Sequence, residues 1–197
     1  MRWNNLFDDL ESQLEHELGA EDSDLQAEEE RLRIGRMSIR DRLWALHEHS
    51  AGARYLVRLD VGGSLIRIAP SGLGKDWLSG SVVGEAEHRI QVIVPLRSIR
   101  GIILDRDQTS NSVAVPSRAG HTGLSVRLGM AFVLRDLCRR RCELDLVLVG
   151  ATVHGTIDRV GRDHVDIAVH EAGTPRRSSA VAQYRIVPID QVLLVRW

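Results

Sequence analysis

Short runs of alternating apolar and polar residues dominate the C-terminal part of this 197-residue chain. Val153, Gly155 and Ile157 alternate with polar neighbours, and a similar alternation begins at His164, after a Gly-Arg-Asp turn. This period of two predicts a pair of strands joined in a hairpin. Pro188 ends a later run, because proline has no N–H for a central strand. Five antiparallel strands are predicted here, near residues 144–148, 152–157, 164–169, 184–187 and 192–195, and we expect such a set to close into a small barrel.

The same pattern occurs earlier in the chain, so the sequence contains an internal repeat. A shift of 87 residues places Leu59 on Leu146 and Gly63 on Gly150, and it places Gly-Lys-Asp-Trp at 74–77 on Gly-Arg-Asp-His at 161–164. The alternation keeps its register under this shift, which makes a chance match improbable. Further on the shift becomes 93, and we place the extra residues of the second copy in a loop over 171–179. Each copy is predicted to be a helix followed by five strands.

The N-terminal region has helical rather than strand periodicity. An apolar stripe recurs every four residues on an acidic background, which predicts a helix that ends near Gly19. A second helical pattern runs from Asp24 to about His49, so the two segments form either one kinked helix or a helical hairpin. The stripe indicates self-packing or oligomerisation, with a dedicated partner helix as the alternative. Its residues are Leu6, Leu10, Leu14 and Leu18.

These patterns together predict a mainly β protein with some α-helix: an N-terminal helical arm followed by two tandem five-stranded small barrels, each preceded by a helix. The arm covers residues 1–37, the first helix and barrel residues 38–104, and the second helix and barrel residues 125–197. Between them, residues 105–124 are rich in Ser, Asn, Gly and Pro, which is typical of a mobile linker or a long loop.

Charge divides the chain unevenly. The net charge is −1, but residues 1–31 contain eleven acidic and two basic side chains, so the remainder carries a charge of +8. A basic body favours a nucleic-acid or acidic partner, for which the acidic arm would compete. No apolar run is long enough to span a bilayer, and the first residues lack a signal-peptide pattern, so we expect a cytoplasmic protein with no membrane partner.

A helix followed by five short strands, with a glycine on the second strand, an Asp-centred turn and a late Val-Pro corner, resembles the Sm-like and SH3-like small barrels. The resemblance covers residues 38–104 and 125–197. It implies that the turns at 74–77 and 161–164 correspond to a loop that lines an RNA-binding pore in rings of Sm-like subunits. The opening Met1-Arg-Trp-Asn-Asn, together with the two barrels, also resembles a group of actinobacterial proteins, which implies no particular activity.

Several residues are candidates for contacts with nucleic acid. A basic residue beside an outward-facing ring can offer both a phosphate contact and a stacking surface. The alternative for the rings is that Trp77 packs under the N-terminal helix and His164 lies at a solvated strand end; helix capping alone would explain part of the arginine run. The candidates are Lys75, Trp77, Arg162 and His164 at the two turns, Arg139, Arg140 and Arg141 at a helix end, and Arg176 and Arg177 in the inserted loop.

No catalytic constellation is present, and we predict no catalytic residue, no metal site and no cofactor. The histidines are scattered; His154, Asp166 and His170 lie on paired strands, but outward polar residues of a barrel account for them. The sequence contains no phosphate-binding glycine loop or serine nucleophile motif. The prediction is a non-enzymatic, homo-oligomeric cytoplasmic protein that binds RNA or DNA through basic loops. The alternative is a protein–protein adaptor or self-assembling scaffold without nucleic-acid binding.

Overall fold

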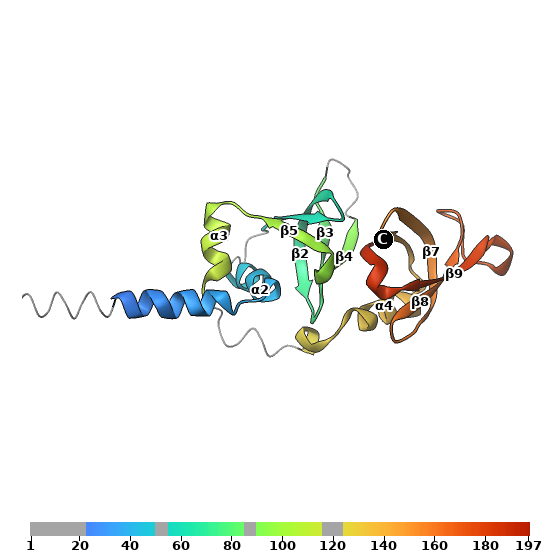
Figure 1. The fold of residues 1–197 in the computed structure, drawn as a ribbon. Helices are drawn as coiled ribbons and strands as arrows, with labels where there is room; N and C mark the ends of the chain where they lie inside the picture. Colours follow the sequence, from blue (N-terminus) through green and yellow to red (C-terminus); the bar gives the residue numbers. More distant parts are fainter. Residues whose placement is uncertain (1–22, 50–54, 85–89, 116–123) are drawn as a thin grey trace, which may run out of the picture. The chain divides into compact units, whose positions relative to one another are not determined.

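The computed structural model describes residues 23–49, 55–84, 90–115 and 124–197 (Figure 1). The chain divides into two compact units: the first ends at Ser38, and the second is Ile39–Trp197. The predicted stripe of Leu6, Leu10, Leu14 and Leu18 lies outside the described residues. Over the part of the chain that is described, no helix has both the length and the apolar character that a bilayer crossing requires.

The second helical pattern of the sequence forms two helices rather than one. The first covers residues 23–35 and is exposed along most of its length, with an Arg33–Glu30 ion pair at 2.6 Å. It ends in two tight turns, in which the amides of Arg36 and Met37 donate to carbonyls three residues earlier. The second helix, α2 (Ile39–His49), begins after this break and buries Leu43 and other apolar residues.

Within Ile39–Trp197 the strands form one antiparallel sheet of ten, in the order β5-β1-β2-β3-β4-β10-β6-β7-β8-β9. The first repeat, as we call it, has β1 (Val57–Val61), β2 (Ser64–Leu73), β3 (Trp77–Val82), β4 (Gln91–Pro95) and β5 (Ile99–Ile103). The second repeat has β6 (Glu143–Leu148), β7 (Ala151–Val160), β8 (His164–Val169), β9 (Gln183–Pro188) and β10 (Val192–Arg196). All five strands predicted for the second repeat are confirmed.

The expected closure of each strand set into a barrel is wrong for the hydrogen-bonded sheet. In both repeats the fifth strand pairs with the first, as a barrel requires, but it does not pair with the fourth. In the first repeat the free side of β4 is taken by β10. The two sets therefore join edge to edge into one sheet that stays open.

Strand register follows the internal repeat. Arg58 lies opposite Arg67, and 87 residues later Asp145 lies opposite His154. The irregularity after Pro70 in β2 recurs at the corresponding place in β7. Even short connections are shared, since the 3-10 helix η1 (Leu96–Ser98) and its counterpart η5 (Ile189–Gln191) both follow a Val-Pro corner.

The β2–β3 and β7–β8 turns also match. The amide of Gly74 donates to the Trp77 carbonyl at 2.8 Å, and the amide of Gly161 donates to the His164 carbonyl at 2.8 Å. In both turns the ring folds over the glycine, so that a Cβ there would lie 2.2 Å from Trp77 and 2.5 Å from His164. Glycine is required at both positions because a side chain would collide with the ring.

The predicted linker over 105–124 contains a helix, α3 (Arg106–Val113). A capping box starts it: the Asp105 carboxylate accepts from the Gln108 amide at 2.8 Å, and the Gln108 side chain accepts from the Asp105 amide at 3.2 Å. Arg42 of α2 holds the far end by donating to the buried Ser112 hydroxyl at 2.6 Å. Polar composition alone suggested a loop, because the packing against α2 is not visible in the local sequence.

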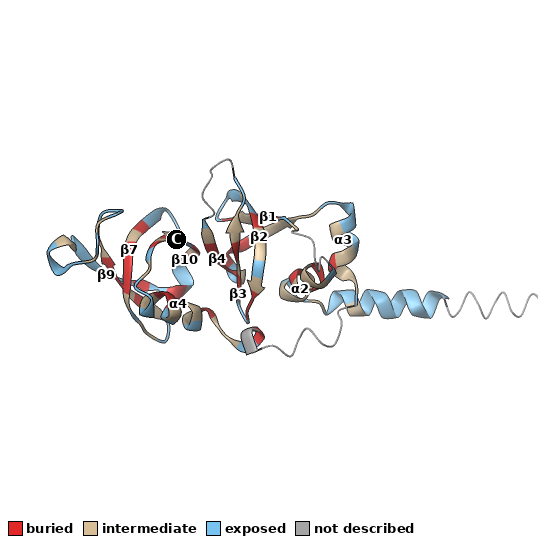
Figure 2. Cartoon of the chain, turned by 180° about the vertical axis from the view of Figure 1, so that it is seen from behind, coloured by how far each residue is buried: buried red, intermediate tan, exposed pale blue. Residues whose placement is uncertain are grey.

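Two apolar cores are present, and each includes residues from both repeats. The core of the second repeat also contains Trp77 and Ile93 of the first, together with residues of α4 (Met130–Arg139). The core of the first repeat contains Leu194 of β10. Figure 2 shows buried residues on strands of both repeats and on α2 and α4. Because each core contains residues of both repeats, the two repeats are expected to fold as one body.

Candidate functional site

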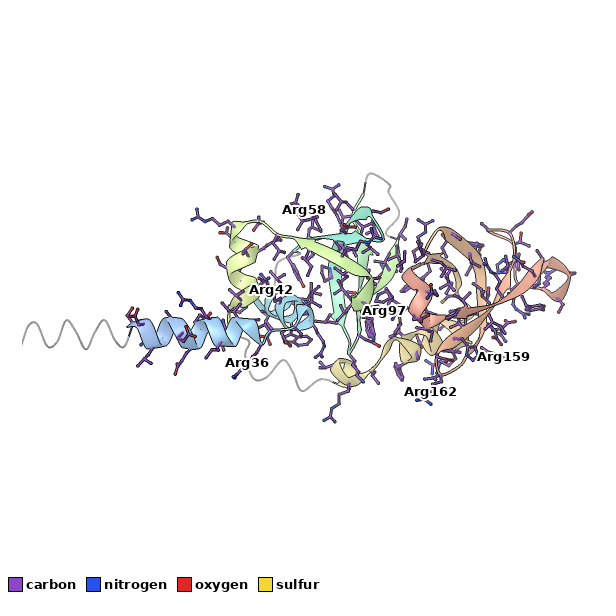
Figure 3. All side chains as sticks on the ribbon, viewed as in Figure 1. Arg36, Arg42, Arg58, Arg97, Arg159 and Arg162 are labelled. Carbon is purple, nitrogen blue, oxygen red and sulfur yellow. The ribbon has the colours of Figure 1, made fainter. Side chains whose placement is uncertain are left out.

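The contact between the two repeats combines polar and apolar interactions. We call it the inter-repeat joint: the β4–β10 pair together with η1 and η5. Ile93 lies opposite Val195, and the backbones of Gln91 and Trp197 exchange two hydrogen bonds of 3.0 Å. Arg97, which Figure 3 places where the repeats meet, donates to the carbonyls of Ile189, Asp190 and Val192. The joint therefore combines strand pairing, burial and a guanidinium bonded to three carbonyls.

Strand β9 is the repeat counterpart of β4, which pairs with β10 in the joint. Among the described residues, β9 has no strand in the position that β10 takes beside β4. Ile186 is the repeat counterpart of Ile93, yet Ile93 is 0% exposed and Ile186 is 72% exposed. Tyr184 on the same face of β9 is also largely exposed. At the other end of the sheet, β5 corresponds to β10 and, within the part of the chain that the structure describes, has no second strand beside it. An uncovered apolar edge strand of this kind is a template for pairing with another chain.

The ring of Trp77 is not a stacking surface, so its predicted outward orientation is wrong. Trp77 is 8% exposed, packs in the core of the second repeat, and donates from Nε1 to the Leu128 carbonyl at 2.9 Å. Neighbouring Asp76 accepts from the Met130 amide at 2.8 Å and so caps α4. The turn thus binds the segment that leads into α4, and Arg40 of α2 also contacts it by donating to the Gly74 carbonyl at 2.9 Å.

The arginine run has acidic partners. Arg139 and Arg140 pair with Asp136 at 2.6 and 3.3 Å, and Arg141 pairs with Asp158 at 3.1 Å. Arg176 also reaches Asp158, so the inserted loop is fastened to β7. The hydrogen bond that Arg176 donates to the Asp158 carboxylate raises the pKa of Arg176. These residues are accordingly poor candidates for a free phosphate-binding patch.

The remaining predicted residues do not converge on one site. Lys75, Arg162 and Arg177 are exposed, and His164 is half-buried with its Nδ1 2.8 Å from an Asp163 oxygen. Arg162 and His164 line a cavity of about 470 Å³ beside Arg97. The same cavity is also lined by Asp76, Asp163 and Asp190. Three carboxylates therefore face two guanidinium groups in this cavity, which does not favour an anionic ligand.

Two arginines outside the predicted set form a more cationic surface. Arg58 and Arg67 lie directly opposite each other on the exposed side of β1 and β2, and Figure 3 shows Arg58 projecting outward. Among the described residues, neither forms an ion pair with an acidic side chain. Like charges in opposed positions destabilise a strand pair. The alternation of β1 and β2 could have identified this pair, because both arginines occupy outward positions.

A second group lies at the opposed position of the second repeat; the sequence analysis named His154 and His170 as outward polar residues, which is wrong for the buried His170, and it did not group them with Glu143. His154 Nδ1 is 2.6 Å from Asp145, and its Nε2 is 2.8 Å from Glu143. Burial opposes its charge, but the hydrogen bonds to both carboxylates outweigh burial and raise the pKa of His154. The buried His170 lies edge-on to His154, with the ring centroids 5.6 Å apart. Glu143 begins β6, His154 lies within β7 and His170 follows β8, so the complete cluster does not form a local sequence motif.

No protein-family model matches this chain, and the searches of curated proteins and of solved structures also found no match.

Proposed function

We propose that this chain is a non-enzymatic module that assembles with further copies of itself through its open strand edges. The observation that supports this is the inter-repeat joint, in which the fourth strand of one repeat pairs with the fifth strand of the other. The same two kinds of edge, β9 and β5, remain open at the ends of the sheet. A second copy that offers β5 to β9 would repeat a contact the chain already makes. We also propose that each repeat is an Sm-like or SH3-like unit, and that the two linked units form one sheet whose outer edges are open.

The internal joint also gives the register of the proposed contact. Ile93 pairs with Val195, and their repeat counterparts are Ile186 and Ile102. We therefore expect Ile186 of one copy to lie opposite Ile102 of the next. Covering Ile186 in this way would remove one of the largest exposed apolar side chains from water.

The contact between copies should be weaker than the internal joint. Asp190 takes the place of Arg97 on the β9 side, so the guanidinium-to-carbonyl bonds of the joint are not available there. Strand pairing and the burial of Ile186 then remain as the main stabilising contributions. A reversible, concentration-dependent association is expected rather than a permanent oligomer.

Sedimentation velocity over a concentration series tests the proposal. The full chain should associate as its concentration rises, and Ile186→Lys should abolish association because lysine on an edge strand blocks pairing. Leu65→Lys is the matched control, since Leu65 is also 72% exposed on a strand but lies away from both open edges. Association that survives Ile186→Lys unchanged would contradict the strand-edge contact and point to the N-terminal arm.

Cysteine crosslinking tests the register directly. Ile102→Cys and Ile186→Cys, introduced in separate chains and mixed under oxidising conditions, should give a crosslinked heterodimer, because opposed Cβ atoms lie about 4.5 to 5.5 Å apart. Cys138 and Cys142 are free thiols and are replaced by serine in both chains. Leu65→Cys in place of Ile186→Cys is the control and should give no crosslink.

A second candidate function is nucleic-acid binding, and the opposed pair Arg58 and Arg67 favours it. Their positive charges would be relieved by a phosphate, whether from RNA or DNA. Filter binding at low and high salt should then show affinity that falls with salt, and Arg58→Ala with Arg67→Ala should reduce the salt dependence. Arg139→Ala with Arg140→Ala, which removes arginines already paired with Asp136, should change it less. Equal losses in both double variants would contradict a site on β1 and β2.

A further inference from the structure

The second repeat holds three potential metal ligands in one place. Each of Glu143, His154 and His170 contributes one ligand atom, and these atoms lie within 4.8 Å of one another. Glu143 opens β6, His154 lies in β7, and His170 follows β8, so three neighbouring strands supply the group. The hydrogen-bonded sheet therefore fixes their backbones relative to one another.

Both imidazoles are held through Nδ1. His154 Nδ1 lies 2.6 Å from the Asp145 carboxylate, and His170 Nδ1 lies 3.1 Å from the Glu171 carbonyl. A carbonyl only accepts, so His170 Nδ1 carries the proton and donates. Metal-ligating histidines usually donate their second ring N–H to a carboxylate or a backbone carbonyl in this way. Both Nε2 atoms are thereby left as the ligand atoms.

The Nε2 atoms face groups that suit a metal ion. His154 Nε2 is 2.8 Å from Glu143, and His170 Nε2 is 2.9 Å from the Thr156 hydroxyl. In the metal-free chain His154 satisfies both carboxylates only as a doubly protonated ring. A divalent cation between Nε2 and Glu143 would replace that proton and satisfy the same acceptor.

The carboxylates around the cluster are positioned by further hydrogen bonds. The Gly173 amide donates to Glu143 at 2.6 Å, and Arg196 Nε donates to Asp145 at 2.8 Å. Glu143 is thus oriented for a ligand role, while Asp145 is held as the partner of His154. A cavity of about 500 Å³, lined in part by Glu143 and His154, gives access from solvent.

From this geometry we infer that Glu143, His154 and His170 form a binding site for a divalent transition-metal ion such as zinc. Zinc holds nitrogen and oxygen ligands at about 2.0 to 2.2 Å in a tetrahedron, which separates the ligand atoms by about 3.4 Å. The His154 Nε2 and Glu143 oxygen atoms are 2.8 Å apart and all three ligand atoms lie within 4.8 Å of one another, so small side-chain rotations are enough to bind zinc. Two imidazoles and one carboxylate select zinc and its neighbours over magnesium and calcium, which prefer oxygen ligands alone.

The first repeat shows that the strand arrangement does not itself require this group. With the shift of 87, the positions of the three ligands are occupied by Leu56, Arg67 and Val83. The position of Asp145 is occupied by Arg58. The same backbone thus carries no ligating side chain there, and the site is specific to the second repeat.

Zinc titration of the untagged full chain tests the inference. After treatment with a chelator and desalting, the protein should bind one zinc ion per chain in competition with a chromophoric chelator. Glu143→Gln and His154→Gln should each weaken binding by at least about 10-fold, and Asp145→Asn by about 10- to 100-fold through loss of the histidine's partner. Magnesium and calcium should not compete.

His164→Gln is the matched control. His164 also has a carboxylate neighbour, Asp163, but it belongs to a different turn and should leave zinc affinity unchanged. Glu143 is exposed, so its variant should fold, and circular dichroism checks this for every variant. Cobalt provides a second readout. The visible absorption of cobalt bound to the original chain should indicate a low-coordinate site with nitrogen ligands. This absorption should be absent in His154→Gln. Failure to bind zinc at micromolar concentration, or equal binding by Glu143→Gln, His154→Gln and His164→Gln, would overturn the site.

Discussion

The two repeats place different chemistry on the same strand register. Ile93 is buried in the joint while its counterpart Ile186 is exposed. Where the first repeat has the opposed arginines Arg58 and Arg67, the second has Asp145 and His154. Inward positions and turn glycines therefore determine the shared fold, whereas outward and edge positions differ between the repeats. The first repeat has a covered β4 edge and a cationic pair. The second repeat has an open β9 edge and a histidine–carboxylate cluster.

The helices differ even more than the strands. In the first repeat α2 packs against α3, whereas in the second α4 packs against β7. The entry to α4 is fixed by the first repeat, since Asp76 accepts from the Met130 amide and Trp77 donates to Leu128. The repeats are therefore related in their strands but interdependent in their helices and cores.

The largest expected effect comes from breaking the joint at its apolar centre. Ile93→Ala should lower the free energy of unfolding by about 2 to 5 kcal/mol, because it removes a fully buried side chain and leaves a cavity. The same change at the repeat-equivalent position, Ile186→Ala, should alter it by less than about 0.5 kcal/mol in the monomer, because that side chain is exposed. Urea denaturation at low protein concentration measures both values.

The shape of the unfolding curve tests whether the two repeats unfold in one cooperative transition. Because Trp77 and Ile93 belong to the core of the second repeat, Ile93→Ala should shift a single cooperative transition rather than release one repeat first. Tryptophan fluorescence and far-ultraviolet circular dichroism should give the same midpoint. Two separated transitions would contradict the shared cores, and equal losses for Ile93→Ala and Ile186→Ala would contradict the exposure difference.

The strands and their repetition could be predicted from sequence because they depend on local information. Alternating apolar residues give the strand faces, and the glycine turn and proline corner give the ends; β6 to β10 follow these signals closely. Barrel closure could not be predicted, because whether β4 pairs with β5 or β10 depends on competition between edges distant in sequence. Alternation reports which face of a strand is apolar but not which edge finds a partner.

The candidate sites were less predictable for a related reason. Trp77 ends a turn that contains Lys75, and nothing in the local sequence reveals that Leu128, 51 residues away, accepts its N–H. Arg141, in a turn, and Arg176, in the inserted loop, have a common acidic partner, Asp158 of β7. The cluster of Glu143, His154 and His170 likewise depends on three strands meeting. The residue types indicate which hydrogen bonds, ion pairs and metal contacts are possible, but pairing between residues distant in sequence determines which of them form.

A smaller effect is expected from the polar part of the joint. Arg97→Ala should destabilise the chain by about 1 to 2 kcal/mol, because it leaves the carbonyls of η5 without their charged donor. The repeat-equivalent change Asp190→Ala removes a side chain that makes no comparable contact across the joint, so its effect should stay within about 0.5 kcal/mol. Arg97→Lys is the control, because lysine retains the positive charge but lacks the planar guanidinium that donates to several carbonyls. If Asp190→Ala cost as much as Arg97→Ala, the joint would not depend on the guanidinium.

The smallest expected effect tests the contrast between the opposed polar pairs. Arg58→Glu places a carboxylate opposite Arg67 and makes the first repeat resemble the second, where acidic Asp145 faces His154. The change should stabilise the chain by about 0.2 to 1 kcal/mol, because it replaces a like-charge pair by an opposite-charge pair. Arg58→Gln removes only the repulsion and should give a smaller gain. Both gains should shrink at about 1 M salt, where the Debye length is about 3 Å, and thermal unfolding at two salt concentrations measures this. A loss of stability in Arg58→Glu at low salt would mean that Arg58 is held by favourable contacts rather than opposed by Arg67.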